Sequence, residues 1–414
     1  MNNKIIDDLK WRGLLNNITN EEKFLKALKQ KKGVYIGFDP SAKSLHLGNY
    51  VMIMMLRRFK TWGVPTFGLV GGATGMIGDP SGKSSERNLL DIDLINENKK
   101  NIIKQLQKYG QVEVLDNYEH FKNYLFLDFL RDIGKLINVN YMLEKETISN
   151  RLESGISFTE FTYTLIQGYD FLFYYQTKNI AIQVGGSDQW GNITTGCEMI
   201  RKVIGDDNLA CGITINLLLK ADGSKFGKSE KGAIFLDKAL TSPYEMYQFL
   251  INQEDKDVIK LLKTLTMLDK KTIDGLAKTL EENPKARAAQ KKLAEVIVSD
   301  IHGDAAYQQS IKISNALFTD NFNSLNEQEL IQIVKTIPNI QLANFQYTLV
   351  ELLVKAKIAP SNREARQLIS ANAIMVNGMK ENDENKVFSN KNTIAQQFSI
   401  IKKGKRNYFI IQWI

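Results

Sequence analysis

The chain has 414 residues, more than one hydrophobic core usually supports, so two or three domains are expected. Its hydrophobic share of 43% and charged share of 24% exclude a disordered or fibrous protein, and its net charge of +8 suits a polyanionic partner or a lysine-rich surface. Cys197 and Cys211 show no CxxC pattern and no nearby histidine pair, which argues against a disulfide framework and a zinc site. The N-terminus lacks a long apolar run, so we expect no signal peptide, no membrane span and a cytoplasmic protein.

The first informative segment is an apolar strand that runs into a turn and then a helix. Residues 34–38 form the strand, a Pro/Ser turn follows, and the letters HLGN at 46–49 open a helix that continues to residue 61. Such a junction presents free backbone N–H groups and the positive end of the helix dipole to an anion. Gly37 and Gly48 leave room for a flat ligand against the main chain.

A glycine-rich loop follows the next expected strand and reads VGGATGMIGDPSGKS over residues 70–84. It is not a Walker A loop, because Ile77 stands where GxxxxGK[ST] needs its first glycine. Asp79, at the end of a strand, suits an ammonium group. Lys83 and Arg87 lie four residues apart and suit either a polyphosphate or a solvated basic face.

A helix expected over residues 158–171 carries polar side chains on an otherwise apolar sequence, FTEFTYTLIQGYDF. Tyr163, Gln167 and Asp170 share one face at positions i, i+4 and i+7. Such groups destabilise a buried helix unless their hydrogen bonds are satisfied. The alternatives are a satisfied buried network, an exposed polar face, or a pocket wall that binds a small polar ligand.

A third loop, QVGGSDQWGN over residues 183–192, follows an apolar strand with a double glycine and an acid. An acid in this place commonly binds ribose hydroxyls, so Asp188 indicates a nucleotide rather than a simple turn. Strands and helices alternate through residue 237, which predicts a doubly wound parallel sheet with ligands at the carboxyl ends of its strands. The expected strands are 34–38, 66–70, 111–115, 180–184 and 233–237, with helices such as 49–61 and 192–202 between them.

A short basic segment, KFGKS at residues 225–229, has the form of a mobile lid. Gly223 precedes it, Gly227 lies within it, and Lys225 and Lys228 provide its charge.

Histidine chemistry is limited, because the chain has only three histidines. His120 and His302 stand in polar contexts and are predicted to be surface residues, whereas His46 lies at the strand–turn–helix junction. No Ser/His/Asp set and no metal-ligand spacing emerges, so we expect neither a hydrolytic triad nor a metal held by the protein. What remains is a site that works by positioning and charge, as nucleotidyl transfer requires.

Beyond residue 237 the pattern changes. Ser242 and Glu245 form a capping box around a proline, and the sequence is helical in pattern to about residue 318. Polar stretches then indicate linkers. From about residue 347 a helix, a turn, a second helix and a strand follow, and the chain closes on basic residues in a turn between apolar strands. These suit the phosphates of a folded RNA or a solvated hairpin.

The motifs DPSAKSLHLGN, VGGATGMIGDPSGKSSER, SGISFTEFTYTLIQGYDF, VGGSDQWGNIT and ADGSKFGKS closely resemble those of bacterial tyrosyl-tRNA synthetases, a family of class I aminoacyl-tRNA synthetases. The resemblance covers nearly the whole chain. It implies a Rossmann-like α/β domain over 1–237, with a dimer-interface insertion at about 121–153 and a lid at 223–230. An α-helical anticodon-arm domain over 238–320, a linker over 321–346 and a small α+β RNA-binding domain over 347–414 would follow.

The resemblance also assigns roles to residues. The tyrosine pocket would comprise Tyr35, Asp79, Tyr163, Gln167, Asp170 and Gln189. Tyr35 and Asp170 would hold the phenolic hydroxyl, and Asp79 the ammonium group. ATP would be bound by Gly37, Asp39, Ser41, His46, Gly48, Asn49, Gly186, Asp188, Lys225 and Lys228. Catalytic charge would come from His46, Lys83, Arg87, Lys225 and Lys228. RNA would be contacted by Arg363, Arg366, Lys402, Lys403, Lys405 and Arg406.

The chain departs from the family pattern at Asn49, where the signature usually has a second histidine. An amide can still donate a hydrogen bond to a ribose oxygen, so we expect function to be retained with altered ATP affinity. Ile36 offers no side-chain hydrogen bond where some relatives have a small polar residue. The implied reaction is attack of the tyrosine carboxylate on the α-phosphorus of Mg-ATP, then transfer to the terminal adenosine of tRNA(Tyr), with no metal site of the protein's own.

Three other functions compete with this one. A tryptophanyl-type synthetase would not need Tyr35 and Asp170 together around a phenol. An RNA-binding protein on an inactive synthetase scaffold is disfavoured by the intact His46, Asp79 and Gln189. A small-molecule adenylyltransferase would have no use for the helical region and the tail. The resemblance implies ATP, tyrosine and tRNA as partners, and a homodimer.

Overall fold

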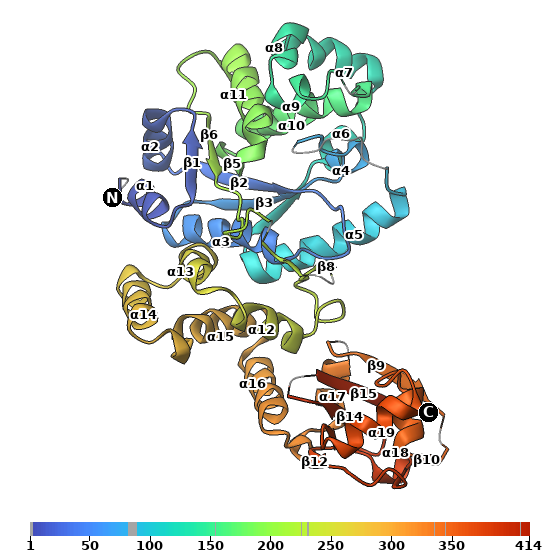
Figure 1. Cartoon of the computed structure of the whole chain (residues 1–414). Helices are drawn as coiled ribbons and strands as arrows, with labels where there is room; N and C mark the ends of the chain where they lie inside the picture. Colours follow the sequence, from blue (N-terminus) through green and yellow to red (C-terminus); the bar gives the residue numbers. More distant parts are fainter. Residues whose placement is uncertain are drawn as a thin grey trace. The chain divides into compact units, whose positions relative to one another are not determined.

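The computed structural model describes residues 3–81, 89–153, 155–224, 226–229, 232–334, 336–343, 345–405 and 407–414. They form two compact units (Figure 1). Unit 1 comprises Met1–Leu236 with Glu254–Ala289, and unit 2 comprises Asp237–Gln253 with Gln290–Ile414. None of the helices in the described ranges is long and apolar enough to cross a membrane.

Unit 1 is built on a six-stranded sheet in the order β1-β6-β5-β2-β3-β4. All neighbouring strands are parallel except β1, which runs antiparallel to β6. The predicted doubly wound parallel sheet is therefore confirmed. The chain order reverses between β2 and β5, where such sheets bind ligands. The strands are β1 (Leu15–Ile18), β2 (Gly33–Phe38), β3 (Thr66–Val70), β4 (Glu113–Asp116), β5 (Ile180–Gly186) and β6 (Cys211–Ile215).

The helices of unit 1 cover both faces of this sheet. Figure 1 shows α10 and α11 on one face and α3 and α5 on the other. The helices are α1 (Asn3–Trp11), α2 (Glu21–Lys29), α3 (Leu47–Thr61), α4 (Thr74–Ile77), α5 (Ile92–Gln105), α6 (Tyr118–Phe121), α7 (Phe126–Asp132), α8 (Val139–Leu143), α9 (Glu146–Ser149), α10 (Phe158–Thr177), α11 (Trp190–Ile204), α13 (Asp255–Leu265) and α14 (Lys270–Glu282).

The strand predictions need three corrections: one predicted strand is wrong and two strands were missed. The segment 233–237 is wrong as a sheet strand, since only β8 (Gly232–Ala233) pairs, with β7 (Lys228–Ser229). Its apolar character has another cause, because Ile234 and Leu236 are buried without joining the large sheet. Strands β1 and β6 were not predicted. The middle of β1 is two exposed asparagines, which removes the alternation that identifies a strand.

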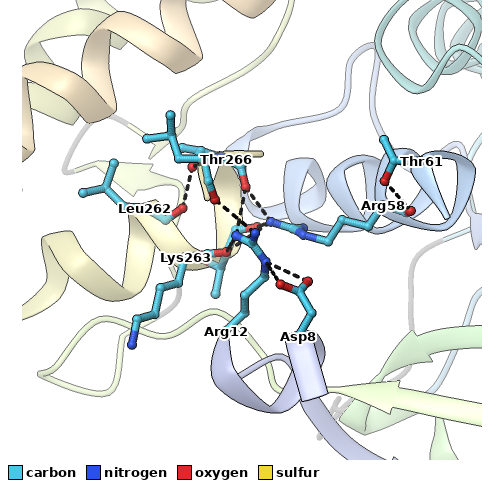
Figure 2. Close-up of polar contacts among 9 residues, drawn as sticks. Asp8, Arg12, Arg58, Thr61, Leu262, Lys263 and Thr266 are labelled. Atoms are coloured by element: carbon cyan, nitrogen blue, oxygen red, sulfur yellow. Dashed lines mark hydrogen bonds and ion pairs between the residues drawn. The ribbon is translucent and has the colours of Figure 1, made fainter. Parts of the chain in front are cut away.

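Two buried arginines hold α13 to the sheet-bearing unit (Figure 2). Arg58, on α3, donates to the backbone oxygen of Thr266 at 2.7 Å, and Arg12 donates to that of Lys263 at 2.9 Å. Arg12 is also paired with Asp8 at 2.9 Å. The last carbonyls of a helix lack partners within it, so these guanidinium groups cap its C-terminal end. Burial and the nearby Arg12 lower the pKa of Arg58 to about 9.

This attachment explains why α13 and α14 group with the sheet, whereas the sequence placed them in a helical domain beginning at residue 238. The two compact units divide the chain differently from the predicted domains. The predicted boundaries at 237, 320 and 346 remain predictions.

Unit 2 combines helices with a five-stranded sheet in the order β12-β11-β14-β15-β9. Ser242 caps α12 as predicted, with its hydroxyl accepting from the Glu245 N–H at 3.1 Å. The helices are α12 (Pro243–Ile251), α15 (Ala288–His302), α16 (Asp304–Thr319), α17 (Glu327–Val334), α18 (Leu349–Lys355) and α19 (Asn362–Ser370). The strands are β9 (Asn339–Leu342), β10 (Tyr347–Thr348), β11 (Ile374–Val376), β12 (Met379–Lys380), β13 (Val387–Phe388), β14 (Phe398–Lys403) and β15 (Asn407–Trp413).

The segment 321–346, predicted as a linker, has regular structure. It contains α17 and β9, and β9 pairs in parallel with β15 at the edge of the five-stranded sheet. Its polar composition reflects exposure rather than lack of structure, since β9 has one buried residue, Leu342.

Candidate active site

A cavity of about 330 Å³ opens at the carboxyl ends of β2 and β5, the point where the strand order reverses. It gathers most of the predicted small-molecule site: Tyr35, Gly37, Asp39, Ser41, His46, Gly48, Asn49, Asp79, Tyr163, Gln167, Asp170, Gly186, Asp188 and Gln189. Lys83, Arg87 and Lys225 lie outside the described residues, and only the backbone of Lys228 is described. Most of these residues converge because they lie at strand ends or helix starts on one edge of the sheet, whereas Tyr163, Gln167 and Asp170 reach the cavity from the middle of α10.

One part of the cavity holds a buried tyrosine and a buried carboxylate. The hydroxyl of Tyr35 has no hydrogen-bond partner among the described residues. Burial, and after it Asp170, raises the pKa of Tyr35, so this group stays a neutral phenol that can donate and accept. Asp170 is 1% exposed, and burial raises its pKa although His120 and Asn117 oppose the shift. An unpaired hydroxyl beside a carboxylate is an arrangement that a ligand hydroxyl completes.

A second part of the cavity concentrates negative charge. Asp79 accepts from Gln189 Nε2 at 2.8 Å and from the Ser81 N–H at 2.9 Å. The Tyr163 hydroxyl donates to Asp39 at 2.9 Å rather than to Asp79, and Thr74 donates to the other Asp39 oxygen at 2.7 Å. Two carboxylates that accept hydrogen bonds from neutral donors suit a cationic ligand group.

On the same wall, Gln167 Oε1 is buried without a hydrogen-bond partner in the described part of the chain. The predicted face of α10 is therefore split, since Tyr163 and Asp170 have protein partners and Gln167 keeps an acceptor for a ligand. This combination favours the pocket wall over a fully satisfied buried network.

The N-terminus of α3 faces the cavity, but its first backbone N–H groups are bonded within the chain rather than free as predicted, so it offers an anion the positive end of the helix dipole and not open donors. His46 caps it, with Nδ1 accepting from the Gly48 N–H at 3.0 Å. Asn49 completes a capping box by accepting from the His46 N–H at 3.2 Å. Asn49, the departure from the family signature, therefore supports the helix start as well as facing the cavity.

The lid segment is anchored against this helix start. Leu47 N–H donates to Ile234 O at 2.9 Å, and Ile234 N–H donates to Gly227 O at 2.8 Å. Gly227 has a φ of +85°, and a Cβ built on it would lie 2.6 Å from the Gly48 nitrogen. Only glycine fits this contact, which brings the two signatures together although they are far apart in the sequence.

The sequence misjudged His120, which is not a surface residue. Its side chain is 7% exposed, its ring stacks on Phe173 at 4.2 Å, and Nε2 lies 2.9 Å from Asp170 Oδ1. Asn117, Thr74 and Gln183 were also missed, although Gln183 lines the cavity with a buried unpaired Oε1. Asn117 directly follows β4, so a search for polar residues at strand ends would have identified it, whereas Asp79 lies beyond α4 and not at the strand end predicted for it.

The basic residues predicted to contact RNA in unit 2 have different environments. Lys402 departs from the prediction, because it lies in β14 with 13% exposure and pairs with Asp320 at 2.6 Å. Lys403 donates to Ile358 O at 3.0 Å. Arg363 and Lys405 are exposed, Arg366 pairs with Glu384 at 3.3 Å, and Arg406 lies outside the described residues.

Comparison with known proteins places these features in context. Residues 26–319 match the family model "tRNA synthetases class I (W and Y)", and residues 329–411 match the C-terminal domain of Tyrosine–tRNA ligase. The Tyrosine–tRNA ligase of Ureaplasma urealyticum serovar 10 is 58% identical over 409 residues, 99% of each chain. Tyrosine–tRNA ligase 1 of Bacillus subtilis is 45% identical over 418 residues, again 99% of each.

Solved structures agree. A C-terminally truncated mitochondrial tyrosyl-tRNA synthetase of Aspergillus nidulans is 28% identical with a TM-score of 0.67, covering 76% of this chain and 94% of that one. A tryptophanyl-tRNA synthetase of Encephalitozoon cuniculi has a TM-score of 0.54 at 15% identity, covering 74% and 87%, which is a likeness of fold alone.

Proposed function

Because the chain belongs to the tyrosine–tRNA ligases, a family of class I aminoacyl-tRNA synthetases, we propose that its cavity between β2 and β5 activates tyrosine with ATP. Ligase activity, ATP binding and a place in translation follow from the family. The tryptophanyl alternative is not favoured, because the close relatives over the full chain are tyrosine–tRNA ligases.

The observation that carries this proposal is the buried pair of Tyr35 and Asp170. The substrate phenol donates to the Asp170 carboxylate and accepts from the otherwise unpaired Tyr35 hydroxyl. Phenylalanine would leave both groups buried and unpaired, and a site built for a hydroxyl rejects the analogue that lacks it. Tyrosyl-tRNA synthetases are themselves the known example of this behaviour.

The ammonium and carboxylate groups of the substrate occupy the charged part of the cavity. Asp79 receives the ammonium group, with Tyr163 and Gln167 beside it on α10. Gln189, already bonded to Asp79, lies near the substrate carboxylate. Fixing both ends of the amino acid turns an encounter of two substrates into a reaction within one complex.

ATP lies along the N-terminus of α3. His46 and Ser41 face the polyphosphate, Gly37 and Gly186 allow the nucleotide close to the backbone, and Asp188 binds the ribose. Magnesium enters as part of Mg-ATP.

The chemistry needs no nucleophile from the protein. A carboxylate oxygen of tyrosine attacks the α-phosphorus, a new P–O bond forms, and the bond to the β-phosphate oxygen breaks to release pyrophosphate. Charge grows on the leaving group, so the helix end and His46 stabilise the transition state more than the ground state. The 3′-terminal adenosine hydroxyl of tRNA then attacks the adenylate carbonyl and releases AMP. Lys83, Arg87, Lys225 and Lys228 remain predicted contributors of positive charge.

We propose a homodimer formed through the insertion at 121–153. Leu125, Phe126 and Leu127 at the start of α7 are exposed by 70%, 67% and 74%. Consecutive apolar side chains with this exposure mark an interface. Unit 2 contributes tRNA binding, and we place the reaction in the cytoplasm, where translation occurs.

ATP–pyrophosphate exchange without tRNA tests the proposed function. Exchange is expected with tyrosine and not with phenylalanine or tryptophan, each offered at equal concentration. Exchange with tryptophan would show that the pocket is misassigned. Absence of exchange in a folded protein that binds tRNA would favour an inactive scaffold, with Asn49 as the first residue to examine.

A further inference from the structure

His120 occupies a position that suits a role in substrate recognition better than a role in packing. It lies on α6, just beyond the end of β4, and its ring stacks on Phe173 with an interplanar angle of 17°. Tyr174 contacts the same ring edge-on at 5.3 Å. These rings fix the imidazole plane and leave Nε2 directed at Asp170 Oδ1, 2.9 Å away.

The Asp170 carboxylate is held from both sides. Asn117 Nδ2 donates to Oδ2 at 2.9 Å while His120 Nε2 faces Oδ1. An ionised carboxylate only accepts hydrogen bonds, so the ring must carry its proton on Nε2. Asn117 is itself fixed, because its Oδ1 accepts from the Ala73 N–H at 2.7 Å. Both oxygens of the Asp170 carboxylate are therefore held by side chains from one short segment, Asn117 and His120.

We infer that His120 is a positioning residue for tyrosine recognition, which fixes the Asp170 carboxylate in place as the acceptor for the substrate phenol. This inference rests on the proposed function. It adds a residue that contacts neither tyrosine nor ATP and acts only through Asp170.

The charges around the pair support this assignment. Burial is the main effect that raises the pKa of Asp170, Asp116 raises it further, and His120 and Asn117 lower it. The Asp116 carboxylate is itself paired with Lys99 at 2.8 Å. The other titratable groups on the surrounding elements are Tyr35 on β2, Glu113 on β4, Tyr118 and Glu119 on α6, Lys122 just after α6, and Glu160, Tyr163, Tyr169, Tyr174 and Tyr175 on α10.

The sign of the pH effect follows from this arrangement. Without His120 the pKa of Asp170 rises further, so the carboxylate becomes protonated at a higher pH. A protonated Asp170 no longer accepts the phenol proton in the same way. Use of tyrosine should then fail at a higher pH than in the unmodified protein, whereas the use of ATP should not change.

Two substitutions of the full-length protein separate the possible roles. His120→Phe keeps a flat ring for the stack and removes the donor, and His120→Gln keeps a donor without a titrating charge. His302→Gln, on α15 in unit 2, is the matched control. Exchange rates are measured with tyrosine and phenylalanine from about pH 6 to 8.5, a range that spans histidine titration, with KM determined for tyrosine and for ATP.

His120→Phe is expected to lower kcat/KM for tyrosine about tenfold, mainly through KM. Its acid limb should move to higher pH, its KM for ATP should stay constant, and its preference for tyrosine over phenylalanine should fall. His120→Gln should recover most of kcat/KM, and His302→Gln should match the unmodified protein. An unchanged tyrosine KM and pH profile in His120→Phe, or equal losses with tyrosine and phenylalanine, would overturn the inference.

A second measurement covers the case in which His120→Phe does not fold. In protein labelled with ¹⁵N-histidine, tyrosine should shift the His120 Nε2 resonance and phenylalanine should not, with His302→Gln and His46→Gln used to identify the other two histidine signals. A His120 Nε2 resonance that does not shift on addition of tyrosine would also overturn the inference. Failure of the proposed function looks different, since the unmodified protein would then show no exchange with tyrosine at all.

Discussion

The cavity of unit 1 and the β14–β15 hairpin of unit 2 both remove polar groups from water, yet they treat them in opposite ways. In the cavity, Tyr35 and Gln167 each keep a buried atom without a hydrogen-bond partner in the described residues. In the hairpin, Lys402 pairs with Asp320 at 2.6 Å, and Tyr408 donates to Leu317 O at 2.6 Å. A buried polar atom without a partner is costly, so it marks a place where a ligand completes the site, whereas a matched pair marks structure.

The same contrast separates motif from composition. The cavity residues belong to long motifs at strand ends, and they converge as predicted. Lys402 was selected because it lies in a run of basic residues, and its charge is used inside the fold. A charge run therefore predicts an RNA contact only where the ammonium groups remain exposed, as at Lys405.

The strongest test of the contrast is Asp170→Asn. It removes a buried carboxylate whose pKa is raised in the folded protein, so at neutral pH the change should raise the free energy of unfolding. A raised pKa means that Asp170 favours the folded state at low pH and opposes it as pH rises through that pKa, so the gain should vanish in acid. Tyrosine activation should fall roughly 100-fold or more. Pyrophosphate exchange and thermal unfolding measure the two effects. A loss of both stability and activity would contradict the contrast between residues that bind the ligand and residues that stabilise the fold.

Lys402→Met tests whether the paired polar groups of the β14–β15 hairpin stabilise the fold. Breaking the pair leaves Asp320 mostly buried without its partner, which should lower the free energy of unfolding of unit 2 by about 2 kcal/mol, less than for a fully buried pair. Adenylate formation should not change. Urea unfolding checks the prediction, and the double change Lys402→Met with Asp320→Asn should recover much of the loss. If Lys402→Met were as stable as the unmodified protein, the ion pair would not contribute to the stability of the fold.

Tyr35→Phe tests whether the unpaired hydroxyl in the cavity serves substrate recognition. It removes a hydroxyl that has no partner in the described residues, so stability should not fall. The enzyme should lose about tenfold in kcat/KM for tyrosine and little for phenylalanine. Exchange assays with the two amino acids measure the ratio. A fall in both values alike would assign Tyr35 to packing rather than to recognition.

Lys405→Ala is the matched counterpart of Lys402→Met and should have the smallest effect. The side chain is exposed, so unfolding should be unchanged. Affinity for tRNA should fall about threefold, with the salt dependence reduced by about one unit of slope. Titrations of tRNA binding at two or more salt concentrations measure both the affinity and its salt dependence. If Lys402→Met weakened tRNA binding while Lys405→Ala did not, the contrast between the residues would be wrong.

The sequence alone was sufficient for the parallel sheet, for the convergence of the strand-end motifs and for the family. These features depend on local patterns, because alternation, glycine placement and helix capping are set by residues close together in the chain. Asp188 and His46 could be assigned for that reason, since Asp188 follows the end of β5 and His46 opens α3, whereas Asp79 lies beyond α4 and not at the strand end where the sequence placed it.

The tertiary structure decided the features that depend on distant partners. His120 approaches Asp170 across 50 residues, and Lys402 approaches Asp320 across 82. Arg58 reaches Thr266 across 208 residues and so fixes α13 to the sheet-bearing unit. Whether a polar side chain is exposed, paired or left open for a ligand depends on what the fold brings against it. No local pattern contains that information, because burial and pairing arise only when the elements pack.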